Sequence, residues 1–332
     1  MEPALLIQER LQLKEQPRLQ KLHGDASNRV YYRTKISDRS VIVMQLPDGA
    51  SSISEEISNQ PPPTELPFLN MARFLSGRGL PVPQVLHDFH PIILLEDLGN
   101  VTLEQQLQST PTQRLYWYQR AIDLLTTFQQ QTHDAGCIAF QRRFDETLLD
   151  WEFDHFIEYG IEARQGIKLS AKNRQALRHE MHAITLALTQ GPQVLVHRDF
   201  QSRNLMVQDD QLRLLDFQDA LMGPLPYDLV GLLRDSYISL NNSELNSLIA
   251  YFLKQSSSPM DHAAFQKIFD WMTVQRKLKD AGRFVYIDRV KGNPNFLPYV
   301  IPSLLYVRQA LERQPELNPL FKLLKKYAPE LS

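Results

Sequence analysis

Short runs of apolar and β-branched residues, separated by polar turns, dominate the N-terminal third of the chain. Residues 30–34 and 41–46 flank a polar turn and predict a β-hairpin. Residues 92–95 are entirely apolar and predict a buried strand, whereas the apolar positions of 68–75 recur at helical spacing. The segment 48–63 is rich in serine and proline and is expected to form a mobile polar loop. This part of the chain is therefore expected to be rich in strands.

Beyond residue 98 the apolar positions recur mainly at three- and four-residue spacing, which is typical of amphipathic helices. Helices are predicted at residues 112–131, 147–160 and 172–189. Further helices are expected towards the C-terminus, with breaks at Gly292-Asn293-Pro294 and Pro298. The sequence thus predicts an α+β chain, with a β-rich lobe at residues 1–97 and a mostly helical lobe at residues 98–332.

Three short apolar runs in the helical half predict strands, at residues 194–196, 205–207 and 212–215. The last two are joined by a polar turn and are expected to pair as a hairpin. Asp199 and Asn204 lie in the loop before this hairpin, and Asp216 follows it, so the hairpin is expected to bring two carboxylates and one amide oxygen together. Such hard oxygen ligands suit Mg²⁺. Each residue type is also common in plain turns, so only the complete set carries the prediction.

The composition narrows the class of protein. The chain has 332 residues, 43% of them hydrophobic, which is enough for sizeable cores. Its net charge of −2 gives no support for a nucleic-acid or anionic-membrane partner. No run of about 18 apolar residues is present for a membrane span, and the single cysteine, Cys137, excludes an intrachain disulfide. We expect a cytoplasmic protein with a buried or half-buried thiol.

Two polar segments outside the central stretch are also informative. Residues 24–29 are small and polar and precede the first predicted hairpin, so their backbone N–H groups are candidates for binding oxyanions. Small polar residues also make plain turns. Asp228 precedes an apolar run and is expected to cap a helix N-terminus.

The spacing of the central polar residues is similar to that of kinase catalytic loops. His197-Arg198-Asp199 is followed by Asn204 and, twelve residues later, by Asp216. Together with other segments, this pattern resembles the aminoglycoside phosphotransferase and choline kinase superfamily, and within it the bacterial kinases of cell-wall amino sugars. The segments that carry the resemblance are 24–27, 95–99, 197–207, 216–220, 227–229, 232–235, 275–276 and 278–279. The resemblance implies a bilobal, protein-kinase-like fold and ATP- and Mg²⁺-dependent phosphorylation of the anomeric hydroxyl of N-acetylmuramate or N-acetylglucosamine.

The resemblance also implies roles for individual residues. Asp199 would be the catalytic base, and Asn204 and Asp216 would be the Mg²⁺ ligands. The expected ATP-binding residues are Gly24, Asp25, Ala26, Ser27, Asn28 and Arg29 over the phosphates, with the backbone of Glu96 to Leu98 at the adenine. The expected sugar-binding residues are Gln201, Arg203, Asp219 and Glu152. Each of three also has a structural interpretation: Arg203 as the partner of an acid in the loop, Glu152 as a solvated helix face and Asp219 as a turn residue.

Two positions depart from the kinase pattern. The strand at 41–46 carries Met44 where kinases have a phosphate-binding lysine, so Arg29 and Arg33 become candidates for neutralising the phosphates. Gln218 stands where protein kinases have glycine, which argues against a regulated switch at this position.

Two alternatives follow from these departures and from the charge pattern. Without the lysine, the chain could be a nucleotide-binding pseudokinase, although the complete set of polar residues argues for turnover. An aminoglycoside- or choline-type kinase is the other alternative, because residues 145–162 carry many acids that would suit a cationic acceptor. The basic residues between Arg276 and Lys291 would equally suit a carboxylate-bearing sugar.

Overall fold

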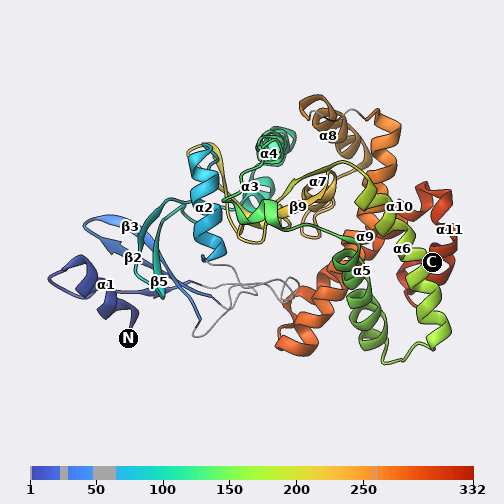
Figure 1. Ribbon diagram of the computed structural model, residues 1–332, viewed down its shortest axis with the longest axis horizontal. Coiled ribbons are helices and arrows are strands. Elements are labelled where there is room, and N and C mark those ends of the chain that lie inside the picture. Colours follow the sequence, from blue (N-terminus) through green and yellow to red (C-terminus); the bar gives the residue numbers. More distant parts are fainter. Residues whose placement is uncertain (1, 23–28, 48–64, 257, 259) are drawn as a thin grey trace. The chain divides into compact units, whose positions relative to one another are not determined.

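The computed structural model describes residues 2–22, 29–47, 65–256, 258 and 260–332 (Figure 1). The chain divides into two compact units. One comprises residues 1–102 and 205–219, and the other comprises residues 103–204 and 220–332. The lobe boundary expected at residue 97 stays a prediction. Residues 24–28 of the expected phosphate loop, and the loop expected at 48–63, lie outside the described residues.

The first unit is built on a five-stranded antiparallel sheet with the order β1-β2-β3-β5-β4. Its strands are β1 (Gln20–Lys21), β2 (Val30–Ile36), β3 (Arg39–Gln45), β4 (Val85–Asp88) and β5 (Ile92–Glu96). The predicted β2–β3 hairpin is confirmed; Ser37 and Asp38 turn it with φ angles of 46° and 67°, which short polar residues tolerate. Helices α1 (Pro3–Leu11) and α2 (Pro67–Gly77) complete the N-terminal part, and α1 packs Leu6 and Ile7 into the core of the sheet.

A second hairpin, distant in sequence, belongs to the first unit. It consists of β7 (Leu205–Gln208) and β8 (Gln211–Leu214), which pair as predicted. Asp209 and Asp210 form its two-residue turn with φ angles of 49° and 58°. The backbone N–H of Leu214 donates to the carbonyl of Pro81 at 2.8 Å, which joins the hairpin to the N-terminal segment.

The second unit is mostly helical. Its longer helices are α3 (Leu103–Ser109), α4 (Arg114–Gln129), α5 (Glu146–His155), α6 (Ala171–Gln190), α7 (Tyr227–Leu233), α8 (Asn242–Gln255), α9 (His262–Lys291), α10 (Val300–Arg313) and α11 (Asn318–Leu324). The π-helical turn η4 (Phe156–Ala163) continues α5. The 3₁₀ turns are η2 (Pro111–Gln113), η3 (Ile138–Gln141), η5 (Ser202–Asn204), η6 (Pro294–Tyr299), η7 (Pro315–Leu317) and η8 (Pro329–Leu331), and β6 (Gln193–Val196) pairs with β9 (Leu221–Pro224).

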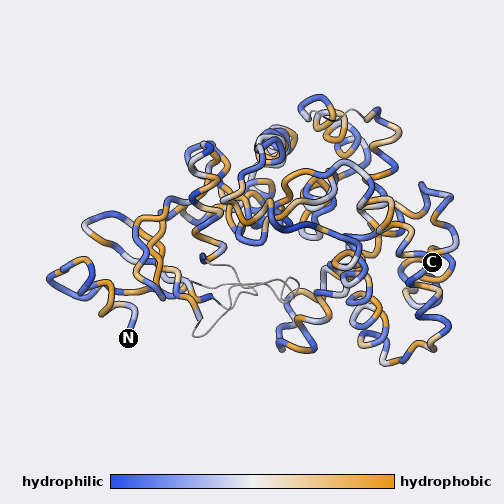
Figure 2. Tube along the Cα trace, viewed as in Figure 1, coloured by the Kyte–Doolittle hydropathy of each residue, from blue (hydrophilic) through white to orange (hydrophobic). Residues whose placement is uncertain are grey.

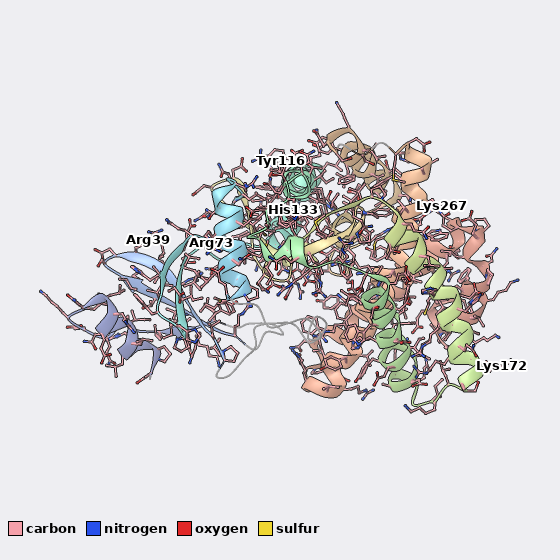
Figure 3. The ribbon with its side chains drawn as sticks, in the orientation of Figure 1. Arg39, Arg73, Tyr116, His133, Lys172 and Lys267 are labelled. Atoms are coloured by element: carbon pink, nitrogen blue, oxygen red, sulfur yellow. The ribbon has the colours of Figure 1, made fainter. Side chains whose placement is uncertain are left out.

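Helix α9 organises this unit, since α5, η4, α6, α7 and α10 all pack against it (Figure 1). Asp261 caps its start by accepting a hydrogen bond from Ala264 N, and Gly292 ends it with a φ of 67°, as the predicted break requires. Hydrophilic and hydrophobic residues alternate along the helices of this unit (Figure 2). Lys172 of α6 lies on the exposed surface, and the exposed Lys267 of α9 pairs with Glu316 (Figure 3).

The predicted α+β class is confirmed, with a β-rich N-terminal sheet and a helical C-terminal region. The buried thiol expected at Cys137 is confirmed as well. Among the described helices, none combines the length and the apolar composition that crossing a bilayer requires.

Candidate active site

The loop that carries Asp199 follows β6 in the second unit and is held by a buried carboxylate of α7. Asp228 accepts hydrogen bonds from the backbone N–H groups of His197 at 2.6 Å and Arg198 at 3.0 Å. The expectation that Asp228 caps its own helix is therefore wrong, because its carboxylate accepts hydrogen bonds from the loop instead. Burial raises the pKa of Asp228 to about 7, although the two N–H donors and the charge of Arg276 favour the ionised form.

Arg276 of α9 holds the same loop from another side. Its Nη1 donates to the carbonyl oxygen of Arg198 at 2.6 Å, and its guanidinium lies over the ring of Tyr227, 4.4 Å from the centroid. Arg198 has a φ of 77°, a conformation that costs free energy in a non-glycine residue and must be imposed by its surroundings. Gly231 permits the approach, since a Cβ there would lie 2.9 Å from the carbonyl oxygen of Phe200.

The far end of the loop is fixed by Asp235, which follows α7. Its Oδ2 accepts hydrogen bonds from Ser202 N at 3.0 Å and Ser202 Oγ at 2.5 Å, and its Oδ1 accepts one from Tyr237 N. Asp235 is fully buried, and burial raises its pKa against the opposing effect of the Ser202 donors. Since a buried carboxylate needs such donors, this pair of residues fixes where the loop ends.

Four of the predicted functional residues lie in this loop, namely Asp199, Gln201, Arg203 and Asn204. Asn204 Nδ2 donates to the carbonyl oxygen of Asp199 at 2.8 Å, and Asn204 N donates to the carbonyl oxygen of Gln201 at 2.9 Å. The side chain of Asp199 is half-buried. The amide nitrogen of Asn204 is thus engaged within the loop, which leaves its Oδ1 as the atom with the chemistry of a metal ligand.

Arg203, an expected sugar-binding residue, is engaged by protein groups. It forms a two-point ion pair with Glu104 of α3, at 2.7 Å and 3.2 Å, and donates to Tyr299 Oη at 3.1 Å. Its guanidinium also stacks on Tyr237, 3.6 Å from the ring centroid. The structural interpretation named an acid in the loop; the acid comes instead from α3, a partner that local sequence could not indicate.

Asp216, in the first unit, is exposed and has a φ of 61°. The buried side chain of Gln218 donates from Nε2 to Asp216 Oδ1 at 2.8 Å and to Asp219 Oδ2 at 3.5 Å. Phe217 stacks on Phe68 of α2 with 5.2 Å between ring centroids. Gln218, where kinases have glycine, therefore orients the carboxylate that the sequence assigns to the metal.

The residues present have the chemistry that Mg²⁺ requires. Asp216 offers a carboxylate and Asn204 offers an amide oxygen, and both are ligand types that Mg²⁺ takes beside phosphate oxygens and water. Asn204 belongs to the second unit and Asp216 to the first. Within the described part of the chain, no group of three or more His, Cys, Asp or Glu side chains is arranged to hold a metal by itself.

The expected adenine-binding segment is fixed by two ion pairs of the first unit. Glu96 pairs with Arg213 at 2.6 Å and also accepts a hydrogen bond from Gln84 N. Asp97 pairs with Arg33 at 2.8 Å. Burial opposes ionisation of both carboxylates, but their donors prevail and lower the pKa of Glu96 and of Asp97. Leu98 is buried. These side chains shape the segment, while the predicted adenine contacts concern its backbone.

The position at which kinases have a phosphate-binding lysine lies in the first unit and is occupied by Met44. Met44 is fully buried in β3, opposite Tyr31 and Ile93. Arg33, proposed from sequence as a substitute cation, donates to Asp97 Oδ1, to Gly99 O and to Asn100 Oδ1. Its guanidinium is thus committed to residues 97–100, and Arg29 remains the other predicted candidate.

Several members of the charge clusters seen in the sequence are buried. Glu152 is fully buried and accepts a hydrogen bond from Gln275 Nε2 at 2.7 Å, so its interpretation as a solvated helix face is wrong. Of the basic residues that were expected to suit a carboxylate-bearing sugar, Arg276, Lys277 and Lys279 are buried. Composition alone could not distinguish these buried charges from surface ones, because it carries no information on which helix face is covered.

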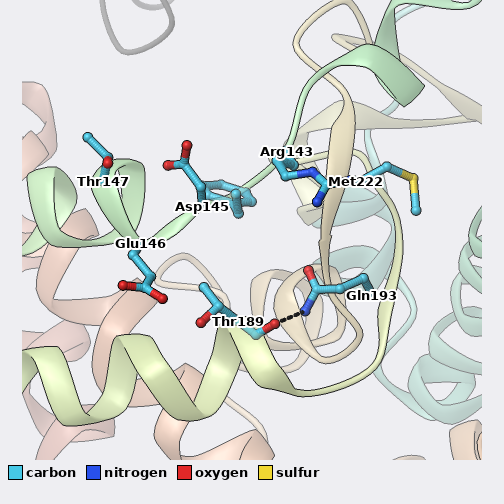
Figure 4. A pocket seen from close by; sticks show the side chains of 8 residues that line it. Arg143, Asp145, Glu146, Thr147, Thr189, Gln193 and Met222 are labelled. Carbon is cyan, nitrogen blue, oxygen red and sulfur yellow. Dashed lines mark hydrogen bonds between the residues drawn. The ribbon is translucent and has the colours of Figure 1, made fainter.

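A cavity of about 360 Å³ opens beside the β6–β9 pair of the second unit (Figure 4). It is lined by Arg143, Phe144, Asp145, Glu146, Thr147, Thr189, Gln193 and Met222. Gln193 spans it to the carbonyl oxygen of Thr189. None of the site residues predicted from the sequence lies among its lining residues.

Comparison with known proteins agrees with this geometry. The sequence profile of the phosphotransferase enzyme family matches residues 18–263. Two similar proteins are named N-acetylmuramate/N-acetylglucosamine kinase. That of Neisseria meningitidis is 34% identical over 91% of this chain and 88% of its own, and that of Pseudomonas aeruginosa is 31% identical over 91% of this chain and 86% of its own.

Solved structures share the fold at low sequence identity. A choline kinase from Streptococcus pneumoniae superimposes with a TM-score of 0.63 at 16% identity, covering 95% of this chain and 98% of its own. An ADP-bound aminoglycoside phosphotransferase gives 0.62 at 14% identity, covering 95% and 99%. The fold is therefore that of these protein-kinase-like phosphotransferases, as the family resemblance implied. With the family profile matching most of its length, the chain belongs to the phosphotransferase enzyme family.

Proposed function

We propose that this protein is a kinase that transfers the γ-phosphoryl group of ATP to the anomeric hydroxyl of N-acetylmuramate and N-acetylglucosamine. The observation that carries the proposal is the similarity, across 91% of the chain, to two proteins named for this pair of sugars. The described geometry supports it, because the loop around Asp199 is held at both ends by buried carboxylates, which phosphoryl transfer needs for positioning.

In this proposal Asp199 accepts the proton of the acceptor hydroxyl and orients its oxygen towards phosphorus. Asn204 and Asp216 would hold Mg²⁺, which, when bound, neutralises charge on the transferring phosphoryl group. Gln218 supports this assignment, because its hydrogen bond fixes one oxygen of Asp216. The site residues assigned from sequence, including Gln201 and Asp219 at the sugar, remain part of the proposal.

The nucleotide would meet the backbone of Glu96 to Leu98 with its adenine, and residues 24–29 with its phosphates. The rigid pairs Glu96–Arg213 and Asp97–Arg33 support this arrangement by fixing the segment around residue 97. The reaction would return cell-wall amino sugars to metabolism in the cytosol.

Turnover distinguishes this proposal from its alternatives. With Mg²⁺ and ATP, the purified protein should release ADP when N-acetylmuramate or N-acetylglucosamine is added, and not with kanamycin or choline. ADP release with kanamycin or choline alone would refute the choice of acceptor. ATP binding without turnover of any acceptor would favour the pseudokinase instead.

A further inference from the structure

One face of α9 connects the catalytic loop with an aromatic cluster. Arg276, Lys279, Arg283 and Tyr286 recur at spacings of three, four and three residues, which places them in one stripe along the helix. Arg276 contacts the carbonyl of Arg198, directly before Asp199. At a rise of about 1.5 Å per residue, Arg283 stands about 10 Å further along the axis. The stripe thus runs from the loop that carries Asp199 along α9 towards Tyr286.

Aromatic rings surround the far end of this stripe. His155 of α5 stacks on Trp151 with 5.3 Å between ring centroids, and it lies 5.2 Å from Tyr286. Tyr159 meets Tyr286 edge to face at 5.0 Å. His155 is buried, whereas Trp151 is 39% exposed and Tyr286 is half-buried. The cluster thus combines a buried base with ring surface accessible to a ligand.

The backbone beneath the cluster is unusual. The chain from Phe156 to Ala163 is π-helical, a conformation frequent at functional sites. Gly282 lets α9 approach it closely, since a Cβ there would lie 2.8 Å from the Cα of Phe156. These two features hold α5, η4 and α9 together and fix the rings relative to the stripe.

The charge around the cluster favours an anionic group on the ligand. Arg283 is half-buried and its Cζ lies 4.7 Å from the centroid of the Tyr286 ring, so its guanidinium is held in place. Of the acids near the cluster, four are engaged by other side chains, whereas Glu158 is exposed. Asp150 bonds to Thr185, Asp154 to Arg178, Glu152 to Gln275 and Glu162 to Arg174.

We infer that this face is the acceptor-sugar subsite and that Arg283 is its specificity-determining residue. The rings of Trp151 and Tyr286 cover the apolar face of the sugar, and Arg283 binds the carboxylate that N-acetylmuramate carries and N-acetylglucosamine lacks. A planar guanidinium suits a carboxylate, because it donates two parallel hydrogen bonds. The inference rests on the proposed function and adds the residue that tells the two sugars apart.

The test compares both sugars in wild type and in Arg283→Gln. We expect kcat/KM for N-acetylmuramate to fall about 10- to 100-fold, the loss of one charge-assisted contact, and kcat/KM for N-acetylglucosamine to change less than about twofold. Retained activity on N-acetylglucosamine shows that the variant is folded. Lys267→Gln, on an exposed residue of the same helix outside the basic stretch 276–291, is the matched control and should leave both sugars unaffected.

The methyl ester of N-acetylmuramate gives a second measurement. Wild type should phosphorylate the ester as poorly as the Arg283→Gln variant phosphorylates the free acid, and the variant should not distinguish ester from acid. Equal losses on both sugars, or no loss on N-acetylmuramate, would overturn the inference while leaving the kinase activity intact. If wild type phosphorylates neither sugar, the proposed function itself fails.

Discussion

The guanidinium of Arg276 donates a 2.6 Å hydrogen bond to the carbonyl oxygen of Arg198, the residue before the proposed catalytic base. Arg276 lies in the middle of α9 and is fully buried, with Tyr227 beneath it. Arg198 holds a left-handed φ of 77°, which turns the chain between β6 and Asp199. A distant helix thereby fixes the backbone of the loop in which the proposed chemistry occurs.

Arg276→Lys should lower kcat about 10- to 100-fold with a smaller change in the KM for ATP. A lysine keeps the positive charge beside Asp228. It cannot both cover the Tyr227 ring with a planar group and donate the hydrogen bond to the carbonyl of Arg198, as the guanidinium does. Steady-state kinetics with both substrates varied would measure this. Arg308→Lys, at a half-exposed position of α10, is the control. An unchanged kcat in the Arg276 variant would show that the bond does not position the base.

Gly231→Ala should destabilise the fold by about 1–3 kcal/mol, the usual cost of overpacking. The new Cβ would lie 2.9 Å from the carbonyl oxygen of Phe200 and 3.0 Å from Arg276 Nη2, so either the loop or the arginine must move. Urea denaturation followed by circular dichroism gives the free energy of unfolding. Gly79→Ala leaves open space around its Cβ and isolates the effect of backbone strain alone. Wild-type stability in the Gly231 variant would contradict the close approach of α7 to the loop.

Gln218→Ala should weaken metal binding about tenfold in the nucleotide complex, because Asp216 loses the 2.8 Å bond that orients it. Mn²⁺ binding in the presence of ADP, followed by electron paramagnetic resonance, reports this without turnover. The Mg²⁺ concentration for half-maximal rate should rise in parallel. The exposed Gln211, in the same hairpin unit, serves as the control when changed to alanine. Equal Mn²⁺ affinity in wild type and Gln218→Ala would contradict the proposal that Gln218 orients a ligand of the metal.

We expect Asp280 to make the free energy of unfolding fall at acid pH. Burial alone would raise its pKa, but Lys277, Arg276 and Lys279 prevail and hold the pKa of Asp280 at about 2. A carboxyl group with a lowered pKa in the folded state stabilises above its unfolded pKa, near 4, and this stabilisation is lost as pH falls towards 2. The contribution is about 2 kcal/mol. Unfolding free energies measured between pH 5 and pH 2.5 should therefore fall more steeply in wild type than in Asp280→Asn; parallel curves would contradict the assignment.

The sequence predicted the elements whose signals are local. The hairpin at β2–β3, the strand β5 and the helices from α4 to α6 follow from periodicity and turn residues. The end of α9 follows from Gly292-Asn293-Pro294, and Gly292 takes a left-handed conformation there. The loop from His197 to Asn204 was recognisable because its chemistry depends on spacing within one segment.

The contacts of the other site residues depend on partners from distant elements, which residue spacing does not reveal. Asp228 is a residue type that commonly caps helices, yet its carboxylate oxygens accept hydrogen bonds from a loop about thirty residues earlier in the chain. Arg203 meets Glu104 from α3, and Glu152 is buried by Gln275 from α9. Buried ionic residues look like surface ones in a sequence, because their neutralising partners lie on other elements.

The most direct test of the account is the phosphorus NMR spectrum of N-acetylmuramate incubated with Mg²⁺, ATP and the protein. We expect the signal of an anomeric sugar phosphate, formed about 10²- to 10⁴-fold more slowly by Asp199→Asn, as loss of a general base predicts. A phosphorylated hydroxyl other than the anomeric one would contradict the proposed regiochemistry. An Asp199→Asn variant as fast as wild type would contradict the central claim that this loop carries the catalytic base.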